Sequence, residues 1–277
     1  MTRLRVGLLF TPSTLSVPEE HRGLQGLDVM IFPELVDGGY ATLVGGGGIH
    51  RQGDALWELF RGASRIAKCT VIGGSMVVAG PSGRRTNMSP VFARGRFVHD
   101  YEKIHVFRPA GDHRYFERGR HICTFTVSLA TGNVKVGIVL CFDLRFPELI
   151  RAMALDGMQV LFVPSRWPVE RDRAWCTLLR ARAIENQIFV VGCNAPDAEG
   201  GHSYVFDPFG ELLLSTEQLP RASLHTVTLD IGRIAEAHRL HWNLKEAVLL
   251  RYATLPRTIP PATAPFRRSG KRRSGGR

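Results

Sequence analysis

The sequence predicts an α/β fold in which β-sheets stack on each other and helices cover their outer faces. Short runs of β-branched and aromatic residues alternate with segments of helical periodicity along most of the 277-residue chain. Helices separate only some of the predicted strands, a pattern that favours stacked sheets. No linker or internal repeat interrupts the pattern, so we expect one domain over residues 1–258.

The first part of the chain predicts several strands around one amphipathic helix. Asp54 is a suitable N-cap for this helix, because its carboxylate can accept a hydrogen bond from the first turn. One face of the helix carries Leu56, Leu59, Phe60 and Ala63. The expected elements are strands Arg5–Phe10, Asp28–Phe32 and Thr70–Val78, the helix Asp54–Lys68, and a hairpin of Val91–Phe92 with Phe97–Tyr101.

The remainder predicts a second hairpin followed by alternating strands and helices. Gly157 ends a short helix, and Asp230 caps the last one, which runs to about Leu240. The other expected elements are strands His121–Leu129 and Val134–Leu140, helix Pro147–Leu155, strand Val160–Val163, helix Arg171–Asn186, and strands Ile188–Gly192, Ser203–Phe206, Glu211–Ser215 and Ser223–Thr228.

Positive charge is concentrated at the C-terminal end. The chain has a formal net charge of +11, and residues 261–277 contain six basic residues and no acid. This segment is also rich in Pro, Ser and Gly, which predicts a disordered basic tail over residues 259–277. Such a tail is either simply solvated or contacts nucleic acid or an anionic surface. The body is mildly basic and lacks an RNA-binding aromatic motif.

The cysteines and apolar runs indicate a cytoplasmic protein. Five cysteines are present, an odd number, and none forms a CxxC pair, which excludes a zinc ribbon or a CxxC redox motif. Buried thiols in a reducing compartment are therefore expected. The apolar runs are too short to cross a membrane, and the first residues are too short a stretch for a secretory signal. We expect no metal and no cofactor.

Cys141 is placed where a nucleophile would be effective. A buried strand ends on it and a helix begins a few residues later, so backbone N–H groups beyond the thiol are free to receive an oxyanion. The position resembles a nucleophile elbow, although no GxSxG motif is present. A cysteine at a strand end is also common as a purely structural residue, so this position alone does not identify a catalyst.

Two further strand ends carry charged residues that could assist a thiol. Glu34 follows the strand Asp28–Phe32, and Lys103 follows the strand that ends at Tyr101. A reactive thiol needs a base and a nearby positive charge. If the strand ends converge, a thiol, a carboxylate and an ammonium meet in one cleft. The alternative interpretation is that Glu34 and Lys103 form a surface pair.

At these residues the sequence resembles the nitrilase superfamily of carbon–nitrogen hydrolases. Glu34 and Lys103 are 69 residues apart and Lys103 and Cys141 are 38 apart, separations usual in that family. The resemblance covers about residues 4 to 240 and is greatest to the omega-amidase branch, whose members hydrolyse the amide of 2-oxo acids derived from glutamine or asparagine. The matching stretches are Phe32–Leu35, Tyr101–Phe107, Leu140–Glu148, Trp167–Pro168, Ala181–Gln187 and Ser203–Gly210.

The resemblance implies an αββα sandwich of two mixed β-sheets and a Glu-Lys-Cys triad. Cys141 would form a thioester with the acyl group, and Glu34 would move the proton to the leaving ammonia and then activate water. Lys103 and the Phe142 backbone N–H would stabilise the oxyanion. The implied substrate is a small linear amide that carries a carboxylate, and the implied assembly is a homodimer.

Two departures from the family pattern stand out. The loop after Lys103 usually holds a second glutamate, whose matching position here is Asp112, shorter by one methylene, about 1 Å. The alternatives are that Asp112 is a turn residue, or that Glu117 takes its place. The family also carries a long helix between the first two strands, but only residues 11–27 intervene here. We therefore expect the first outer helix to be truncated to about Pro18–Leu24.

Arg166 and Trp167 follow the strand Val160–Val163 and are candidate substrate-binding residues. Arg166 would hold a substrate carboxylate, or it is solvated. Trp167 would line the acyl pocket, or it belongs to the core. Arg145 and Glu148 are expected to form ion pairs near the elbow.

The leading hypothesis is a cofactor-free amidase that acts on a small-molecule amide. Nitrile or N-carbamoyl hydrolysis is an alternative, because the same acyl intermediate serves both reactions. A further alternative is a binding protein that has this fold but weakened catalytic activity and that binds its partner through the basic tail. The shorter Asp112 and the truncated helix favour that alternative, whereas the complete triad argues against it.

Overall fold

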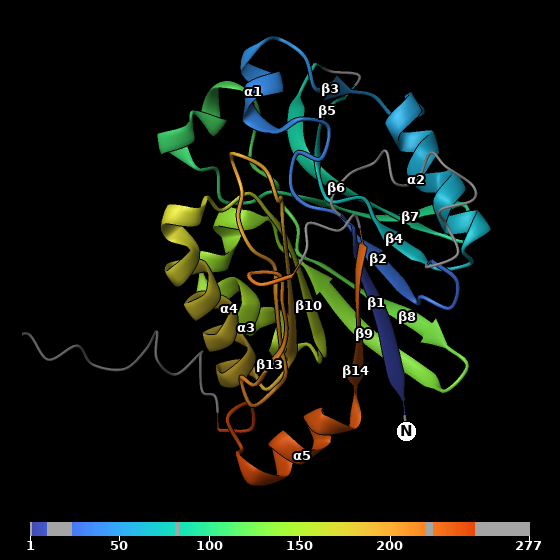
Figure 1. Ribbon diagram of the computed structural model, residues 1–277, viewed down its shortest axis with the longest axis vertical. Helices are drawn as coiled ribbons and strands as arrows, with labels where there is room; N and C mark the ends of the chain where they lie inside the picture. The colour runs from blue at the N-terminus through green and yellow to red at the C-terminus, as the bar shows by residue number, and fades with distance from the viewer. Residues whose placement is uncertain (1, 10–23, 81–82, 220–223, 247–277) are drawn as a thin grey trace, which may run out of the picture. The chain divides into compact units, whose positions relative to one another are not determined.

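The computed structural model (Figure 1) describes residues 2–9, 24–80, 83–219 and 224–246. The chain divides into two compact units, Met1–Leu244 and Lys245–Arg277, and the second is described only at residues 245 and 246. The predicted domain end at residue 258 and the basic tail over 259–277 lie outside the described residues. The truncated helix expected at Pro18–Leu24 does so too, except for Leu24. These features stay predictions.

The first unit contains an eight-stranded sheet with the order β14-β1-β2-β4-β6-β5-β3, in which β7 also pairs with β6. The strands β1, β2 and β4 are parallel, and the predicted hairpin of β6 and β7 is confirmed. The strands are β1 (Arg3–Leu9), β2 (Val29–Ile31), β3 (Ile49–His50), β4 (Thr70–Ile72), β5 (Met76–Ala79), β6 (Arg85–Ala93), β7 (Arg96–Glu102) and β14 (Leu224–Asp230).

The other sheet has six strands in the order β13-β12-β11-β10-β9-β8. Its central strands β9, β10 and β11 are parallel, and β8 and β9 form the second predicted hairpin. The strands are β8 (Cys123–Leu129), β9 (Gly132–Ile138), β10 (Val160–Ser165), β11 (Phe189–Asn194), β12 (Tyr204–Phe206) and β13 (Leu212–Ser215).

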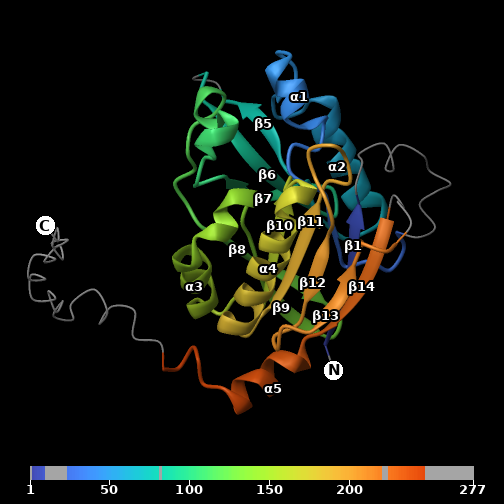
Figure 2. The same cartoon turned by 60° about the vertical axis from the view of Figure 1, so that its left-hand side comes forward.

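Helices cover the outer face of each sheet. The helix α2 (Ala55–Ile66) packs on the eight-stranded sheet through Trp57, Phe60 and Ala63. The helices α3 (Pro147–Leu155) and α4 (Asp172–Asn186) pack on the six-stranded sheet. Figure 2 shows the two sheets between these layers. The inner faces of both sheets share one apolar cluster, which includes Leu8, Ile31, Phe125 and Phe162. This arrangement is the predicted αββα sandwich.

The remaining elements are short helices. The helix α5 (Gly232–Leu240) follows β14; its N-cap is Ile231 and not the expected Asp230, whose carboxylate accepts a hydrogen bond from the Gly232 N–H at the start of the helix. Around the ends of the parallel strands lie α1 (Gly39–Val44) and the 3₁₀ helices η3 (Arg108–Ala110), η4 (Asp112–Arg114), η5 (Cys141–Arg145) and η6 (Val169–Arg171).

The expectation of one strand over Thr70–Val78 is wrong. Residues 73–75 divide it into β4 and β5, both of which pair with β6. Gly74 has a φ of +62°, and a Cβ there would overlap the carbonyl oxygen of Pro33. The break places Ser75 next to the residues that precede and follow Glu34. It therefore helps to form the candidate site.

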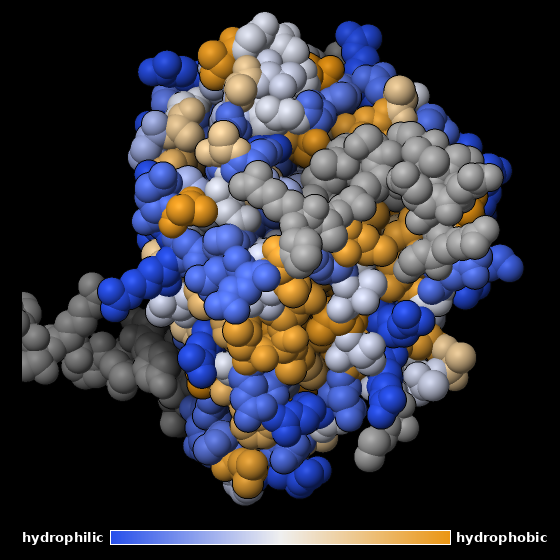
Figure 3. Space-filling view, in the orientation of Figure 1, coloured by the Kyte–Doolittle hydropathy of each residue, from blue (hydrophilic) through white to orange (hydrophobic). Residues whose placement is uncertain are grey.

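The surface carries exposed apolar side chains at the sheet edges. Figure 3 shows them gathered on the face where β13 and β14 lie. The edge strand β13 exposes Leu212 and Leu213 by 52% and 41%. An edge strand with exposed leucines is a typical place for association, but the expected homodimer stays a prediction. In the described part of the chain, no helix has the length and apolarity needed to cross a membrane.

The thiols are placed as the cysteine spacing predicts. All five cysteines are free, and four of them are buried, whereas Cys176 is partly exposed. Buried apolar surroundings raise the pKa of Cys69 and of Cys123 to about 12. These thiols therefore act as small apolar residues.

We predict that Gly74→Ala lowers the free energy of unfolding by about 2 to 4 kcal/mol, because the new Cβ meets the Pro33 carbonyl at an unfavourable φ. Urea unfolding followed by circular dichroism measures the change. Gly157→Ala is the matched control, since Gly157 has a φ of +86° and open space around a Cβ. We expect the control to lose about 1 kcal/mol. Equal losses in both variants would contradict the overlap with Pro33.

Candidate active site

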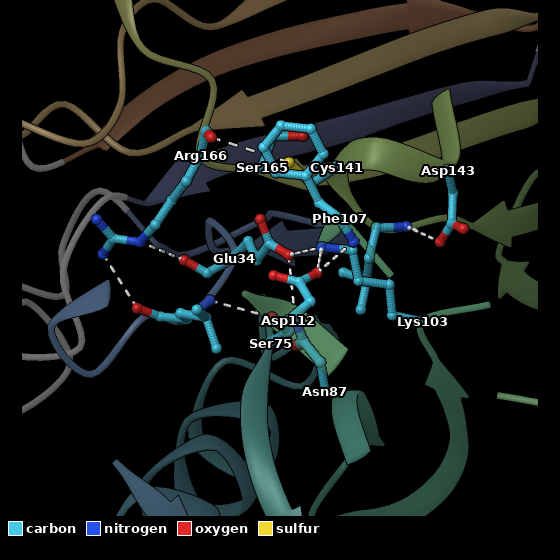
Figure 4. A network of polar contacts seen from close by, with 12 residues as sticks. Glu34, Ser75, Asn87, Lys103, Phe107, Asp112, Cys141, Asp143, Ser165 and Arg166 are labelled. Atoms are coloured by element: carbon cyan, nitrogen blue, oxygen red, sulfur yellow. Dashed lines mark hydrogen bonds and ion pairs between the residues drawn. The ribbon is translucent and has the colours of Figure 1, made fainter. Parts of the chain in front are cut away.

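Three strand ends bring Glu34, Lys103 and Cys141 together (Figure 4). Lys103 Nζ donates to Glu34 Oε1 at 2.8 Å and to Asp112 Oδ2 at 2.9 Å. The side chains of all three of these residues are fully buried. A buried ammonium requires such partners, because the desolvation of an unpaired charge costs several kcal/mol. The alternative of a surface pair between Glu34 and Lys103 is therefore wrong.

Glu34 lies in a segment fixed from the β4–β5 break. The Ser75 N–H donates to the Pro33 carbonyl at 3.2 Å, and Ser75 Oγ accepts from the Leu35 N–H at 3.0 Å. Leu35 has a φ of +45°, which turns the chain sharply after Glu34. Asn87 Nδ2 donates to Glu34 Oε1 at 2.9 Å. These contacts fix one carboxylate oxygen and set the direction of the other.

The second oxygen of Glu34 is free to accept a proton. Among the described residues, Oε2 is buried and has no hydrogen-bond partner. Figure 4 shows it pointing toward the sulfur of Cys141. A buried carboxylate oxygen without a donor is costly unless chemistry uses it. The geometry thus places an available base beside the thiol.

Arg166 holds this segment from the opposite side. Its Nε donates to the Glu34 carbonyl at 2.8 Å, and Nη2 donates to the Leu35 carbonyl at 3.0 Å. Its Nη1 pairs with Asp197 at 2.6 Å and lies 3.6 Å from Glu199. Arg166 is buried and each of its nitrogens has a protein acceptor. This arginine fixes the Glu34 segment and is not solvated, and it also lines the pocket that opens onto Cys141.

Cys141 begins η5 in a strained backbone conformation. Its φ is +46°, in the left-handed region that a residue with a Cβ rarely adopts. The turn is held by Arg182 of α4, whose Nε and Nη2 donate to the Leu144 carbonyl at 3.1 and 2.9 Å. The Phe142 N–H lies in the first turn of η5, where N–H groups have no intrahelical acceptor.

Asp143 ties the Cys141 turn to the strand that carries Lys103. Its Oδ2 accepts from the Leu140 N–H at 3.1 Å and from the Tyr101 hydroxyl at 2.8 Å. Its Oδ1 accepts from the His105 N–H at 2.8 Å. Because Tyr101 and His105 flank Lys103, this buried carboxylate fixes the ammonium relative to the thiol.

Asp112 reaches Lys103 despite its short side chain. Gly111, with a φ of +85°, joins η3 to η4 and brings the backbone of Asp112 close. Besides Lys103, Asp112 Oδ2 accepts from the Phe107 N–H at 2.8 Å, and Oδ1 accepts from the Tyr40 hydroxyl at 2.9 Å. The alternative residue, Glu117, is 58% exposed and pairs with Arg84 outside the site.

The charges favour a neutral thiol at rest. Burial raises the pKa of Cys141, the charge of Glu34 raises it further, and Lys103 only partly offsets both. Burial alone would lower the pKa of Lys103, but the neighbouring acidic groups, Glu34 first, raise it well above its usual range. The resting site therefore holds a protonated thiol beside a charged ammonium.

A pocket of about 270 Å³ opens onto Cys141. Trp167 lines it, as expected, and the Arg145 guanidinium lies 4.6 Å from the centre of the Trp167 ring. The ion pairs expected of Arg145 and Glu148 near the elbow do not form, since neither residue has an ion-pair partner among the described residues. The Arg145 side chain faces the pocket instead. No group of three or more His, Cys, Asp or Glu side chains in the described ranges is placed to hold a metal ion.

Sequence reasoning missed several residues of this site. Asn87 lies in a strand as one of three buried polar residues, Thr86, Asn87 and Ser89, and polar residues in an otherwise apolar strand were an available signal. Asp143 lies two residues after Cys141 in the motif itself. Nothing local distinguishes Tyr40 or Ser75, because their partners are distant in the sequence.

Comparisons with known proteins identify relatives of this chain. A family model described as carbon-nitrogen hydrolase matches residues 17–239. The chain is 33% identical over 191 residues to a 2-oxoglutaramate amidase of Bacillus subtilis, covering 67% of this chain and 72% of that protein. It is 30% identical over 202 residues to omega-amidase YafV of Escherichia coli K12, covering 70% and 75%.

A solved structure shows the same fold. The CN-hydrolase superfamily protein XC1258 from Xanthomonas campestris matches with a TM-score of 0.73 at 22% identity, covering 89% of this chain and 98% of that chain. The match confirms the sandwich architecture that the sequence predicts.

We predict that iodoacetamide alkylates Cys141 slowly at neutral pH in the free protein, with a rate that rises only in the alkaline range. The reason is that the raised pKa keeps the thiolate fraction small. Intact-mass measurements from about pH 6 to 10 follow the reaction. Cys141→Ala identifies the adducts on the other thiols. Fast alkylation that does not change between about pH 6 and 8 would show a resting thiolate and contradict this charge distribution.

Proposed function

The chain belongs to the carbon–nitrogen hydrolase family, and we propose that it hydrolyses the amide of a small linear, carboxylate-bearing molecule through a thioester on Cys141. The products are ammonia and the free acid. The observation that carries this proposal is the unpartnered Oε2 of Glu34, a buried base directed at a protonated thiol beside a buried ammonium. The names of the two amidase relatives support the same reaction.

Acylation begins when the Cys141 sulfur attacks the amide carbonyl carbon. The thiol proton moves to Glu34 Oε2 as the C–S bond forms, and the carbonyl oxygen becomes an oxyanion. Lys103 Nζ has three donors, of which Glu34 and Asp112 take two. The third donor and the Phe142 N–H stabilise the oxyanion. The C–N bond then breaks, and Glu34 returns the proton to the nitrogen, which leaves as ammonia.

Deacylation uses the same base. Glu34, again a carboxylate, takes a proton from a water molecule as the water oxygen attacks the thioester carbonyl. The second tetrahedral intermediate has the same oxyanion donors. When the C–S bond breaks, the proton on Glu34 returns to the sulfur, and the free acid leaves. Both half-reactions balance without a cofactor.

Arg145 supports the choice of a carboxylate-bearing substrate. Its guanidinium lines the pocket, stacks on Trp167 and has no acidic partner in the described part of the chain. A guanidinium binds a carboxylate through paired, charge-assisted hydrogen bonds. Because Arg166 is occupied by the Glu34 segment, Arg145 takes the role that the sequence suggests for Arg166.

The protein is expected to release ammonia from 2-oxoglutaramate or succinamate, because both carry a terminal amide and a carboxylate. With Cys141→Ala the rate should fall at least about 1,000-fold, since Cys141 is the thiol that lines the pocket. Intact mass under substrate should show an acyl adduct that is absent in the variant. Ammonia from matched nitriles or N-carbamoyl compounds, with none from amides, would overturn the amide assignment.

Arg145→Gln should lower kcat/KM for the carboxylate-bearing amide about 10- to 100-fold, because a charge-assisted hydrogen bond is lost. A neutral amide of similar length, such as butyramide, provides the control and should change less than about threefold. Ammonia release measures both substrates. An equal fall on the two amides would assign Arg145 a structural role only.

A further inference from the structure

Tyr40 and Asp112 form a hydrogen-bonded pair, and Tyr40 is the member of the pair that faces the substrate pocket. Tyr40 lines the pocket together with Cys141, whereas Asp112 is fully buried behind it. The Tyr40 hydroxyl donates to Asp112 Oδ1 at 2.9 Å. Burial raises the pKa of Tyr40, and the charges of Glu34, Lys103, Asp112 and Cys141 all act on it. The hydroxyl therefore stays protonated and lies within electrostatic reach of every reacting group.

The backbone around Tyr40 is fixed, so the position of the hydroxyl does not depend on a mobile loop. Glu199 Oε2 accepts from the Tyr40 N–H at 2.7 Å, and Oε1 accepts from the Ala41 N–H at 2.8 Å. Gly39 precedes them with a φ of +71°, and a Cβ there would overlap Glu199. The Tyr40 ring packs on the apolar cluster of Leu35, Leu43, Val77, Val106 and Phe116.

Asp112 is fully buried and does not line the pocket, so it does not contact a substrate directly. Lys103 and the Phe107 N–H occupy Oδ2, and Tyr40 occupies Oδ1. The Tyr40 hydroxyl has one proton, which it donates to Asp112, and two lone pairs that can accept hydrogen bonds. A hydroxyl that donates to a carboxylate is a stronger acceptor, because hydrogen bonds in a chain polarise one another.

We propose that the Tyr40 hydroxyl oxygen accepts a hydrogen bond from the N–H of the substrate amide while it donates its own proton to Asp112. This inference rests on the proposed function. The contact orients the amide nitrogen, which leaves as ammonia after it receives the proton held by Glu34. Tyr40 is thus a substrate-contacting residue that selects a leaving group with an N–H, and the shorter Asp112 acts through it.

The test compares the amide with the methyl ester of the same acid, because both give the same thioester but the ester leaving group has no N–H. In Tyr40→Phe we expect kcat/KM for succinamate to fall about 10- to 100-fold, and that for monomethyl succinate to change less than about threefold. Tyr115→Phe is the matched control, since Tyr115 packs on the same cluster. It should leave both substrates unchanged.

Each result decides for or against Tyr40. An equal fall on both substrates in Tyr40→Phe, no fall on either, or the same amide loss in Tyr115→Phe overturns the proposal. If the wild-type protein does not hydrolyse the ester, the ester measurement is replaced by the pH profile of Cys141 alkylation, compared between the wild-type protein and Tyr40→Phe. An unchanged profile with lost amide hydrolysis supports the contact, and an altered profile overturns it. Absence of ammonia release by the wild-type protein would instead overturn the proposed function.

Discussion

The burial of the Lys103 ammonium is the constraint on which the rest of the site depends. Its side chain has no exposure, so its charge must be balanced within the protein. Glu34 and Asp112 supply that balance from two segments far apart in the sequence, and each carboxylate needs its own fixed position. Ser75 and Asn87 hold the first, and the Phe107 N–H and Tyr40 hold the second. Burial first and the charge of Glu34 second raise the pKa of Cys141 more than Lys103 lowers it, which keeps the thiol protonated at rest.

Two irregular backbone conformations lie within the site itself. Positive φ values occur at Leu35, beside the base, and at Cys141 itself. Such conformations persist only where surrounding contacts fix them, and here two arginines do so. Arg166 holds the carbonyls after Glu34, and Arg182 holds the carbonyl of Leu144 in the Cys141 turn. The two positive φ values lie at the site, whereas the cluster between the two sheets is apolar. The two sheets thus serve as a rigid support for a preorganised polar cluster.

Much of this arrangement could be predicted from the strand ends together with the family resemblance. Glu34 and Cys141 follow the ends of β2 and β9, which belong to different sheets, so their meeting was expected from the family resemblance and not from the strand ends alone. The helix Pro147–Leu155 also matches its predicted limits, since a proline and a glycine mark its ends. The break between β4 and β5 was not predicted, because the β-branched residues on both sides were given more weight than the consecutive Gly73 and Gly74. The role of the break is clear only from the structure, in which Ser75 lies beside the Glu34 segment.

Roles that depend on distant partners could not be predicted from local sequence. Arg166 and Arg145 are both arginines near the cleft, but one meets the carbonyls of Glu34 and Leu35 and the other meets an open pocket. Asp112 appeared too short for its place until the turn at Gly111 was seen to carry its backbone toward Lys103.

The most direct test of this account is a crystal structure of Cys141→Ala with succinamate bound. The account predicts that the amide carbonyl oxygen lies within hydrogen-bond distance of both Lys103 Nζ and the Phe142 N–H, with Lys103 still between Glu34 and Asp112. A carbonyl oxygen directed away from Lys103, or a lysine that has left either carboxylate, would contradict it.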